Sequence, residues 1–278
     1  TYTYGFDSEN YGLKTQTTEV ELMSTPKQDA DGYYLISSAS KLIWFRDQVN
    51  SGNTAIKGRM TANIDLSSVE NWSPIGTKSK PFAGSFDGGN FTVSNMNVTF
   101  AATSGSGAPY LGLFGYVKGT ASQNAEIKNL NVTGKEDITA NYRNTYAYSG
   151  GVAGYVEYTN FTDVSSSVNV TVTYGSVTSG WGSVGGFCGM AKNAKYLRCY
   201  NHGDVTAPGY YTTGFCGKSE YVSYTSCGNT GAITGSAYTA GFGSETKATT
   251  LVDCYNTGSI SLVTYGGKYK QQCAAGLV

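Results

Sequence analysis

Short runs of β-branched and aromatic residues, broken by glycine and asparagine, recur along most of the chain. The clearest run is YLGLFGYV at 110–117, and weaker copies of its glycine-containing core follow at 151–154, 186–189, 214–217, 241–244 and 276–278. Measured at the residue after the first glycine of each copy, the intervals are 39, 35, 28, 27 and 35 residues. A period near thirty residues is typical of stacked structural repeats. The pattern therefore predicts coils that wind around one axis.

A second column, of asparagines, accompanies the glycine runs. Each copy has an apolar residue, an asparagine two positions later and a β-branched residue five or six positions later, at 93–98, 127–132, 199–205, 227–233 and 254–260. Segment 164–170 is a further copy with serine in the asparagine place. Asparagine tolerates left-handed turns, and stacked amides hydrogen-bond to one another. We therefore expect a structural ladder of Asn95, Asn129, Asn201, Asn229 and Asn256.

One stretch before the repeats has helical rather than strand periodicity. Leu42, Phe45 and Val49 fall at spacings of three and four, Ser38 or Ser40 can cap the start, and 50–53 (NSGN) ends it. An open β-edge pairs with other chains unless it is covered. We therefore predict an N-terminal capping helix over 38–50. Further upstream, apolar and polar residues alternate over 17–25, which predicts one strand.

Composition excludes several classes of partner. Among 278 residues, 19 Lys and Arg balance 19 Asp and Glu, so nothing attracts nucleic acid or an anionic membrane. No apolar run approaches the roughly 20 residues that a membrane helix needs, and we expect no membrane insertion. The chain begins at Thr1 rather than Met and stops inside a repeat at Val278. We expect a processed or excised piece of a longer protein.

The order of several blocks resembles the GLUG-type repeat family of bacterial surface and secreted proteins. The similar blocks are GYYLI at 32–36, the helix with LIWF at 42–45 and VNSG at 49–52, NIDL at 63–66, WSPIG at 72–76, FAGSFDG at 82–88 and GLFG at 112–115. The resemblance implies a right-handed parallel β-helix displayed outside a bacterium, and it implies no catalytic residue. Some relatives are zinc proteases that cut immunoglobulin A, but their His-Glu-x-x-His signature is absent here. The resemblance therefore does not carry protease activity to this chain.

The predicted fold is all-β: a right-handed parallel β-helix, or β-solenoid, of about seven or eight coils with an N-terminal capping helix. Residues 1–32 form an extended segment with one strand, and 33–278 form a single β-helix domain. Within it, 33–54 is the capping region and 55–278 are coils, the last one incomplete. The first coils have strands near 56–60, 63–66, 81–86 and 91–98, and loops interrupt the repeats at 101–109, 135–149 and 173–184.

A search for catalytic groups finds little. His202 is the sole histidine and occupies a turn position held by threonine in later coils, so it cannot pair with a second His around a metal. Asp65 and Asp87 are the best carboxylates for a polysaccharide lyase or hydrolase, which needs clustered acids, although Asp-Gly-Gly is also ordinary turn chemistry. We expect no catalytic residue, no metal and no cofactor, and a protein that is not an enzyme.

Six cysteines fall at apolar positions of the repeat. Such substitution favours buried, structural thiols. In an exported protein, disulfides linking 188 to 199, 216 to 227 and 254 to 273 are the alternative. The set is Cys188, Cys199, Cys216, Cys227, Cys254 and Cys273.

Tyrosine is in excess, with 23 copies. Tyr148, Tyr211 and Tyr238 each lie three residues before a repeat glycine, and Tyr110 lies two before. They are predicted to stack into an aromatic strip beside Trp181. Aromatic strips bind sugar rings or flat protein surfaces, because both present an apolar face with polar edges. The alternative is a ladder that only covers the wall of the helix.

The leading function is a non-enzymatic extracellular or cell-surface module of a bacterium, a rigid stalk or adhesin whose tyrosine face binds a glycan or a host or bacterial surface protein. One alternative is a self-assembling subunit of an extracellular filament, joined head to tail through the uncapped end of the β-helix to copies of itself. Another is a polysaccharide lyase or glycoside hydrolase of the β-helix type.

Overall fold

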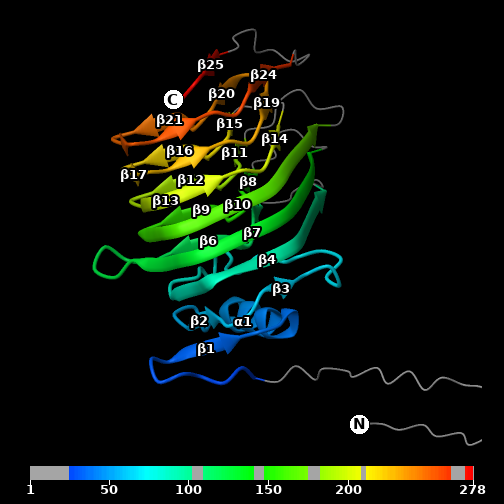
Figure 1. Ribbon diagram of the computed structural model, residues 1–278, viewed down its shortest axis with the longest axis vertical. Coiled ribbons are helices and arrows are strands. Elements are labelled where there is room, and N and C mark those ends of the chain that lie inside the picture. Colours follow the sequence, from blue (N-terminus) through cyan, green and yellow to red (C-terminus); the bar gives the residue numbers. More distant parts are fainter. Residues whose placement is uncertain are drawn as a thin grey trace, which may run out of the picture.

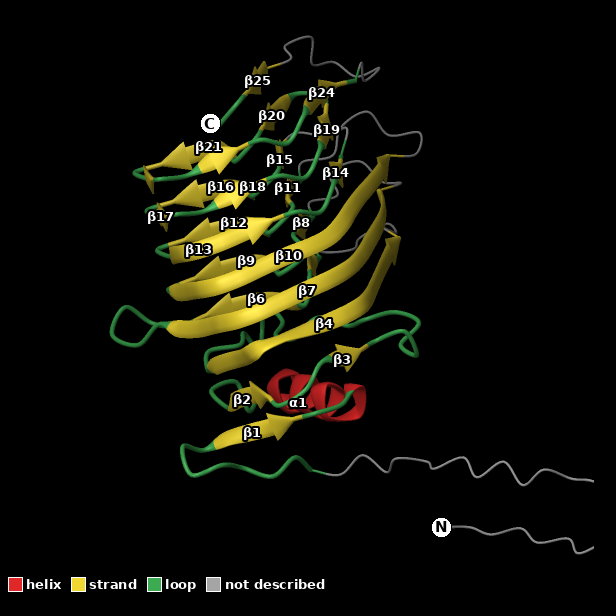
Figure 2. Ribbon diagram, viewed as in Figure 1, coloured by secondary structure: helices red, strands yellow, loops and turns green. Residues whose placement is uncertain are grey.

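The computed structural model describes residues 25–101, 109–140, 147–174, 182–207, 211–263 and 273–277. Most of the predicted strand at 17–25, Trp181 and Val278 lie outside the described residues, as does the side chain of Cys273. The described residues are mostly β-strands, arranged in parallel sheets that stack along one axis (Figure 1). Apart from one helix near the N-terminal end, strands and loops make up the stack (Figure 2). The fold is therefore an all-β, solenoid-like stack of strands that form parallel sheets along its length.

Three sheets run along the stack, and from β4 to β21 each turn of the chain visits all three. The 14-stranded sheet contains β1 Tyr33–Ile36, β2 Lys57–Met60, β3 Ile64–Asp65, β4 Ser85–Ala101, β7 Ala125–Ala140, β10 Thr159–Tyr174, β13 Lys195–Asn201, β14 Val205–Thr206, β17 Ser223–Thr225, β18 Gly228–Asn229, β19 Ile233–Gly235, β22 Thr250–Val252, β23 Tyr255–Asn256 and β24 Ile260–Leu262. The six-stranded sheet contains β5 Tyr110–Leu111, β8 Tyr148–Ser149, β11 Ser183–Gly185, β15 Tyr211–Thr213, β20 Tyr238–Ala240 and β25 Cys273–Ala275. The five-stranded sheet contains β6 Phe114–Lys118, β9 Ala153–Glu157, β12 Cys188–Lys192, β16 Cys216–Glu220 and β21 Gly243–Lys247.

The register of these sheets reproduces the glycine repeat. In the five-stranded sheet, Cα partners run from Phe114 to Ala153, Cys188, Cys216 and Gly243, which are the positions that the repeat brings together. All these pairs are parallel. The prediction of parallel coils from the spacing of glycine runs is therefore confirmed.

The predicted asparagine ladder is only partly correct. Asn201, Asn229 and Asn256 are neighbours: the Nδ2 of Asn201 donates to the Oδ1 of Asn229 (2.8 Å), and the Nδ2 of Asn229 donates to the Oδ1 of Asn256 (2.7 Å). Asn95 and Asn129 do not belong to this column, which continues downward through Ser166 to Val132. Both instead adopt positive φ (56° and 52°), and their amides donate to Asp65 and Asp87. These two asparagines therefore occupy positions where the backbone turns with left-handed geometry, and they are not members of the ladder.

The repeat glycines are explained by the asparagine column. A Cβ on Gly186 would lie 2.2 Å from the Nδ2 of Asn201, and one on Gly214 would lie 2.2 Å from the Nδ2 of Asn229. The glycines therefore leave the space that the buried amides fill. The glycine column and the asparagine column of the sequence therefore pack directly against each other.

Two predicted loops begin later than expected. The chain remains in β7 up to Ala140 and in β10 up to Tyr174, and these ends pair with each other. The reason is burial: Ile138 and Val172 face the interior as Cα partners, at 2% and 3% exposure. The segment 135–140, predicted as loop, is therefore strand.

Aromatic rings fill the interior along the axis. Phe187, Phe215 and Phe242 stack with centroids 4.8 and 4.6 Å apart. A second stack joins Phe161 to Tyr196 and Tyr196 to Tyr224, at 4.9 and 4.8 Å. All of these rings are buried, so the core is continuous from coil to coil.

The helix α1 spans Ala39–Ser51 and lies at the N-terminal end of the stack, near β1 and β2 (Figure 1). Leu42, Phe45 and Val49 are buried, as the spacing predicts. The Phe45 ring packs edge-on against Phe82 and Phe86, with centroids 5.8 and 5.6 Å away. Ser38 is the N-cap residue but makes no side-chain cap bond. No helix in the described part of the chain is long and apolar enough to cross a membrane.

Candidate binding surface

Four tyrosines from two coils form a packed cluster on the outside of the stack. Tyr110 and Tyr148 begin β5 and β8 and are Cα partners, and their rings stack at 5.4 Å with an interplanar angle of 5°. Tyr116 and Tyr155 from β6 and β9 stack at 4.5 Å. The two stacks meet edge to face, at 5.0 Å for Tyr110 with Tyr116. We call these four residues the tyrosine cluster.

The cluster presents rigid, half-buried rings. Each such pair of rings contributes about 0.5–1.5 kcal/mol of stabilisation beyond that of the surface area it buries, so the rings hold one another in place. Burial raises the pKa of Tyr110, Tyr116 and Tyr155, which keeps all three hydroxyls protonated around neutral pH. The surface therefore offers neutral hydroxyls above apolar ring faces.

The predicted aromatic strip does not continue without a break. The next coil places Ser183 in the tyrosine column, and its buried hydroxyl donates to the carbonyl of Gly189 (2.7 Å). Beyond it, Tyr211 and Tyr238 form a second stack at 5.3 Å. The strip is thus two tyrosine stacks with one coil between them.

The second stack has a charged neighbour. The Nζ of Lys218 lies 3.9 Å from the centroid of Tyr211 and 2.8 Å from the Oε2 of Glu245. Burial and a hydrogen bond to Glu245 raise the pKa of Tyr211 to about 12. A cation over a ring face is held by the ring quadrupole. Lys218 therefore has both an aromatic and an acidic partner.

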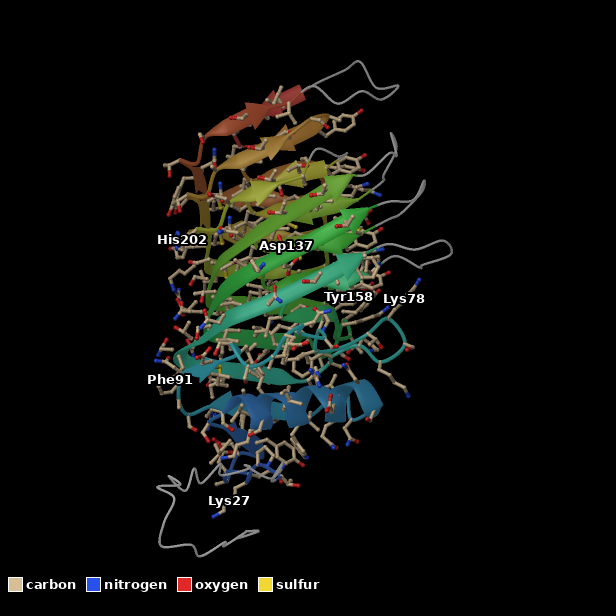
Figure 3. The ribbon with its side chains drawn as sticks, turned by 90° about the vertical axis from the view of Figure 1, so that its right-hand side faces the viewer. Lys27, Lys78, Phe91, Asp137, Tyr158 and His202 are labelled. Atoms are coloured by element: carbon tan, nitrogen blue, oxygen red, sulfur yellow. The ribbon has the colours of Figure 1, made fainter. Side chains whose placement is uncertain are left out.

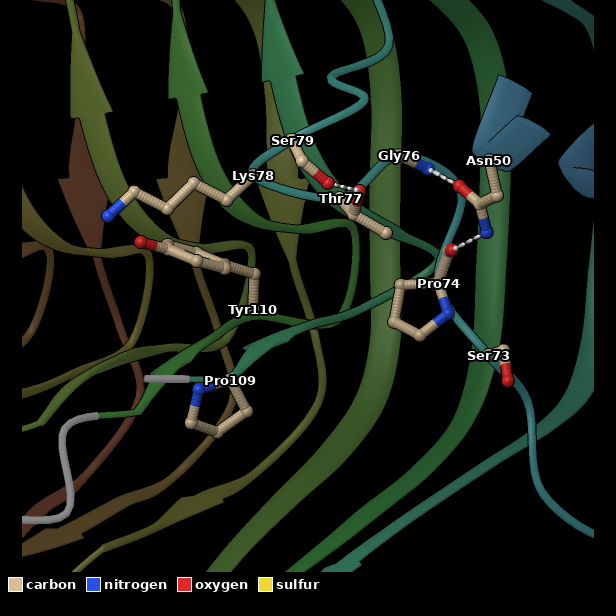
Figure 4. Close-up of a pocket in the computed structure, with 9 residues that line it drawn as sticks. All are labelled: Asn50, Ser73, Pro74, Gly76, Thr77, Lys78, Ser79, Pro109 and Tyr110. Carbon is tan, nitrogen blue, oxygen red and sulfur yellow. Dashed lines mark hydrogen bonds between the residues drawn. The ribbon is translucent and has the colours of Figure 1, made fainter. Parts of the chain in front are cut away.

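A groove adjoins the first stack. It has a volume of about 770 Å³ and is lined by Asn50, Ser73, Pro74, Gly76, Thr77, Lys78, Ser79, Pro109 and Tyr110 (Figure 4). The end of α1, the 73–79 segment and the start of β5 supply these residues. Asn50 fixes one wall, because its Nδ2 donates to the carbonyl of Pro74 (3.1 Å) and its Oδ1 accepts from the amide of Gly76 (2.8 Å). The groove thus has a preset shape of ligand-binding size.

Sequence reasoning missed Tyr116, Tyr155 and the groove. The two tyrosines follow the second glycine of their repeats directly, in Gly-Tyr-Val, so the aligned copies already contained this signal. The groove had no such signal, because it needs 73–79 and 109–110 to meet between two neighbouring coils.

Lysine and glutamate alternate along another column of the five-stranded sheet. Lys118, Glu157, Lys192, Glu220 and Lys247 are successive Cα partners. Lys118 and Glu157 form an ion pair at 2.9 Å, and Lys192 and Glu220 approach to 3.8 Å. Each exposed pair contributes at most about 1 kcal/mol, but the alternation neutralises this side of the stack.

The cysteines for which the structure describes side chains are free thiols: Cys188, Cys199, Cys216, Cys227 and Cys254. Each thiol donates to a backbone carbonyl two residues away, at 3.2–3.5 Å. Neighbours lie along the axis, since Cys188 and Cys216 are Cα partners. Burial raises the pKa of Cys188 well above its ordinary value, which suits an unreactive core thiol.

The polar groups considered for catalysis are occupied by turn contacts. The Nδ1 of His202 pairs with the hydroxyl of Thr230 (2.8 Å) on the exposed surface, on the other side of the stack from Lys78 (Figure 3). Asp65 accepts from Asn95 and the amide of Ser67, and these bonds lower its pKa. Asp87 accepts from Asn129 and from the amide of its own turn. No cluster of metal-binding side chains occurs within the described ranges.

One carboxyl group lies inside the stack. Glu136 occupies an interior column between Val98 and Val170 and is fully buried. The hydroxyl of Ser149 donates to its Oε2 (2.5 Å), while its Oε1 has no hydrogen-bond partner. Burial raises the pKa of Glu136 to about 7. Neither the repeat nor the composition indicated this residue, because it stands where the other coils have an aliphatic side chain.

No family model matches the chain, and no curated protein matches it in sequence. Two solved structures are similar in fold. One is described as "putative immunoglobulin A1 protease from Bacteroides ovatus", with a TM-score of 0.57 at 14% identity over 90% of this chain and 86% of the other. The second, described as "IgA1 Protease", has a TM-score of 0.50 at 14% identity and covers 89% of this chain but 21% of the other. Likeness at this identity concerns the fold alone.

Proposed function

We propose that the chain is a rigid module of a bacterial surface protein of the GLUG-repeat type: a right-handed parallel β-helix of about seven or eight coils, with α1 as its cap. It acts without catalysis, as a stalk or adhesin outside the cell. The tyrosine cluster binds a glycan or a flat protein surface. The alternative of a polysaccharide lyase or hydrolase is kept as an outcome of the experiment below.

The geometry of the tyrosine cluster carries the proposal. Four rings from two coils are held together in stacked and edge contacts, and burial keeps the pKa of Tyr110, Tyr116 and Tyr155 above the ordinary value, so these hydroxyls are neutral. A sugar ring has an apolar face and polar edges, and preset aromatic faces bind it with little loss of side-chain freedom. Extracellular location is supported by the names of the two structural neighbours, since immunoglobulin A1 is found outside cells.

A binding screen against immobilised glycans and extracellular proteins tests the function. Replacing Tyr148 by Ala removes the stacking partner of Tyr110 and an edge contact with Tyr155, and we expect binding to fall at least about tenfold. Tyr221→Asn is the matched control, because Tyr221 is 50% exposed, lies outside the cluster and has a positive φ (56°) that asparagine tolerates. Equal losses in both variants, or no binding by the parent chain, would contradict the proposal. Glycan cleavage that depends on Asp87, with or without calcium, would favour the enzyme alternative.

A second candidate, assembly into a filament, is favoured by the C-terminal end of the stack. Val252, Tyr255, Leu262 and Val263 are 37–46% exposed there, whereas Ile233, one coil below, is 1% exposed. Unpaired parallel strands with apolar residues are templates for another chain. At the other end, the amide of Leu35 in β1 already donates to the carbonyl of Lys27 (2.8 Å), so part of that edge is paired. The two ends therefore differ in what they offer to a second copy.

A further inference from the structure

The groove beside the tyrosine cluster contains one cation and no described anion. Lys78 is exposed at its rim, and the lining residues that the structure describes include no carboxylate. Lys78 makes no ion pair with the described residues. Lys118 in β6, in contrast, forms an ion pair with Glu157 at 2.9 Å. The groove therefore has a positive end in a chain whose formal net charge is zero.

The positive end coincides with a flat aromatic wall. Figure 4 shows the Lys78 side chain extended alongside the ring of Tyr110, at the opposite end of the groove from Asn50. The Tyr110 ring is held by its stack with Tyr148 and its edge contact with Tyr116. A ligand that satisfies both features needs a ring with an apolar face and an anionic substituent next to it.

Small polar groups complete the lining. Thr77 and Ser79 carry exposed hydroxyls, 3.3 Å apart, in a turn closed by the amide of Lys80 donating to the carbonyl of Thr77 (3.1 Å). The two hydroxyls hydrogen-bond to each other, and their remaining donor and acceptor capacity can be used by the hydroxyls of a sugar. A flat protein surface does not need a groove, whereas a single sugar unit fits one.

We propose that this groove binds an acidic sugar unit of a glycan, with its ring against Tyr110 and its carboxylate or sulfate at Lys78. The inference rests on the proposed glycan-binding function and narrows it to an anionic class. The neutral part of the same glycan continues over the tyrosine cluster. Binding weakens with salt, because the contact with Lys78 is exposed and screened.

The experiment compares three probes on the purified chain by calorimetry: a uronic-acid oligosaccharide, a sulfated oligosaccharide and the carboxyl-reduced, neutral form of the first. We expect an acidic probe to bind about three- to fivefold more tightly than the neutral one, and Lys78→Ala to remove that difference. Lys27→Ala is the control, since Lys27 lies at the far N-terminal end of the stack (Figure 3). Thermal melting of each variant checks that the fold is unchanged.

The outcomes distinguish failure of the acidic-sugar site from failure of the proposed glycan-binding function. Equal binding of acidic and neutral probes, lost in Tyr148→Ala but kept in Lys78→Ala, overturns the acidic-sugar site and leaves the glycan-binding surface. Absence of binding to all three probes overturns the site, and together with an empty screen of glycans and extracellular proteins it overturns the binding surface as well. Preference for an acidic probe that Lys27→Ala abolishes equally overturns the assignment to Lys78.

Discussion

At the scale of single residues, the buried Glu136 makes stability depend on pH. Its pKa is about 7 in the folded chain against an ordinary 4.5, so the folded state binds a proton more tightly than the unfolded state. Stability is therefore greatest below the unfolded pKa, falls as pH rises from about 4.5 to 7, and is flat above. The loss amounts to about 3 kcal/mol.

The substitution Glu136→Gln tests this dependence. Glutamine keeps an acceptor for the Ser149 hydroxyl but does not ionise. We expect Glu136→Gln to exceed the parent by about 2–3 kcal/mol at pH 8.5 and to match it near pH 4.5, in urea denaturation followed by circular dichroism. A parent chain that is equally stable at both pH values would contradict the assignment of a buried, protonated Glu136.

The asparagine column gives a second prediction at this scale. Asn229 is fully buried, accepts from Asn201 and donates to Asn256 and to the carbonyl of Gly231. Asn229→Ala leaves those buried groups without partners, so we expect a loss of about 2–3 kcal/mol in the free energy of unfolding. Asn95→Gly keeps the left-handed corner and removes only an exposed contact to Asp65, so a loss below about 1 kcal/mol is expected. Similar losses in the two variants would contradict the ladder.

At the scale of elements, the ring of Phe45 packs α1 against the first coils. Phe45 packs against Phe82 and Phe86, and a Cβ on Gly58 would lie 2.8 Å from its ring. Phe45→Ala opens a cavity between helix and coil, and we expect it to cost about 3–5 kcal/mol in thermal or urea unfolding. Lys41→Ala, a change at the surface of the same helix, should stay within about 0.5 kcal/mol. A small effect of Phe45→Ala would show that the helix is not part of the core.

Elements also show what the sequence could predict and what it could not. The glycine runs and the helical spacing of Leu42, Phe45 and Val49 depend on local pattern, and both predictions agree with the structure. The alignment of Asn129 with Asn201 failed because Leu130, not Ile127, lies in the column of Val164 and Cys199. Asn95 is displaced because β4 and β7 pair with register shifts between Asp87 and Phe91 and between Val93 and Met96. Such irregularities add a residue on one strand and leave no repeat signal in the sequence.

Part of the candidate site could likewise be predicted from the sequence, and part could not. Tyr110, Tyr148, Tyr211 and Tyr238 share a column that the spacing from glycine reveals. Lys78 could not be found, because it reaches Tyr110 only when a turn of an early coil meets the start of a later strand. Contacts between coils of unequal length need the structure.

At the scale of the whole molecule, the exposed strands at the C-terminal end predict self-association. If this end binds a second copy, sedimentation velocity of the purified chain should show a mass that rises with concentration, with fibres in electron micrographs of the same samples. Leu262→Lys places a charge on the exposed edge and should lower the association at least about tenfold. Lys195→Ala, at an exposed position of β13 in the middle of the stack, serves as control. A mass that stays that of one chain across the series would contradict the filament candidate.

The strands of the 14-stranded sheet that precede the six-stranded sheet end next to one another along the stack. The connections from these strands to the six-stranded sheet run from 101 to 110, 140 to 148, 174 to 183, 206 to 211, 235 to 238 and 262 to 273, so they differ in length while the strands on either side stay in register. Loop length is thermodynamically inexpensive compared with a register shift. A foreign peptide grafted into any one of these connections would therefore be displayed at a defined position along the stack axis. Neighbouring positions would lie one strand spacing apart.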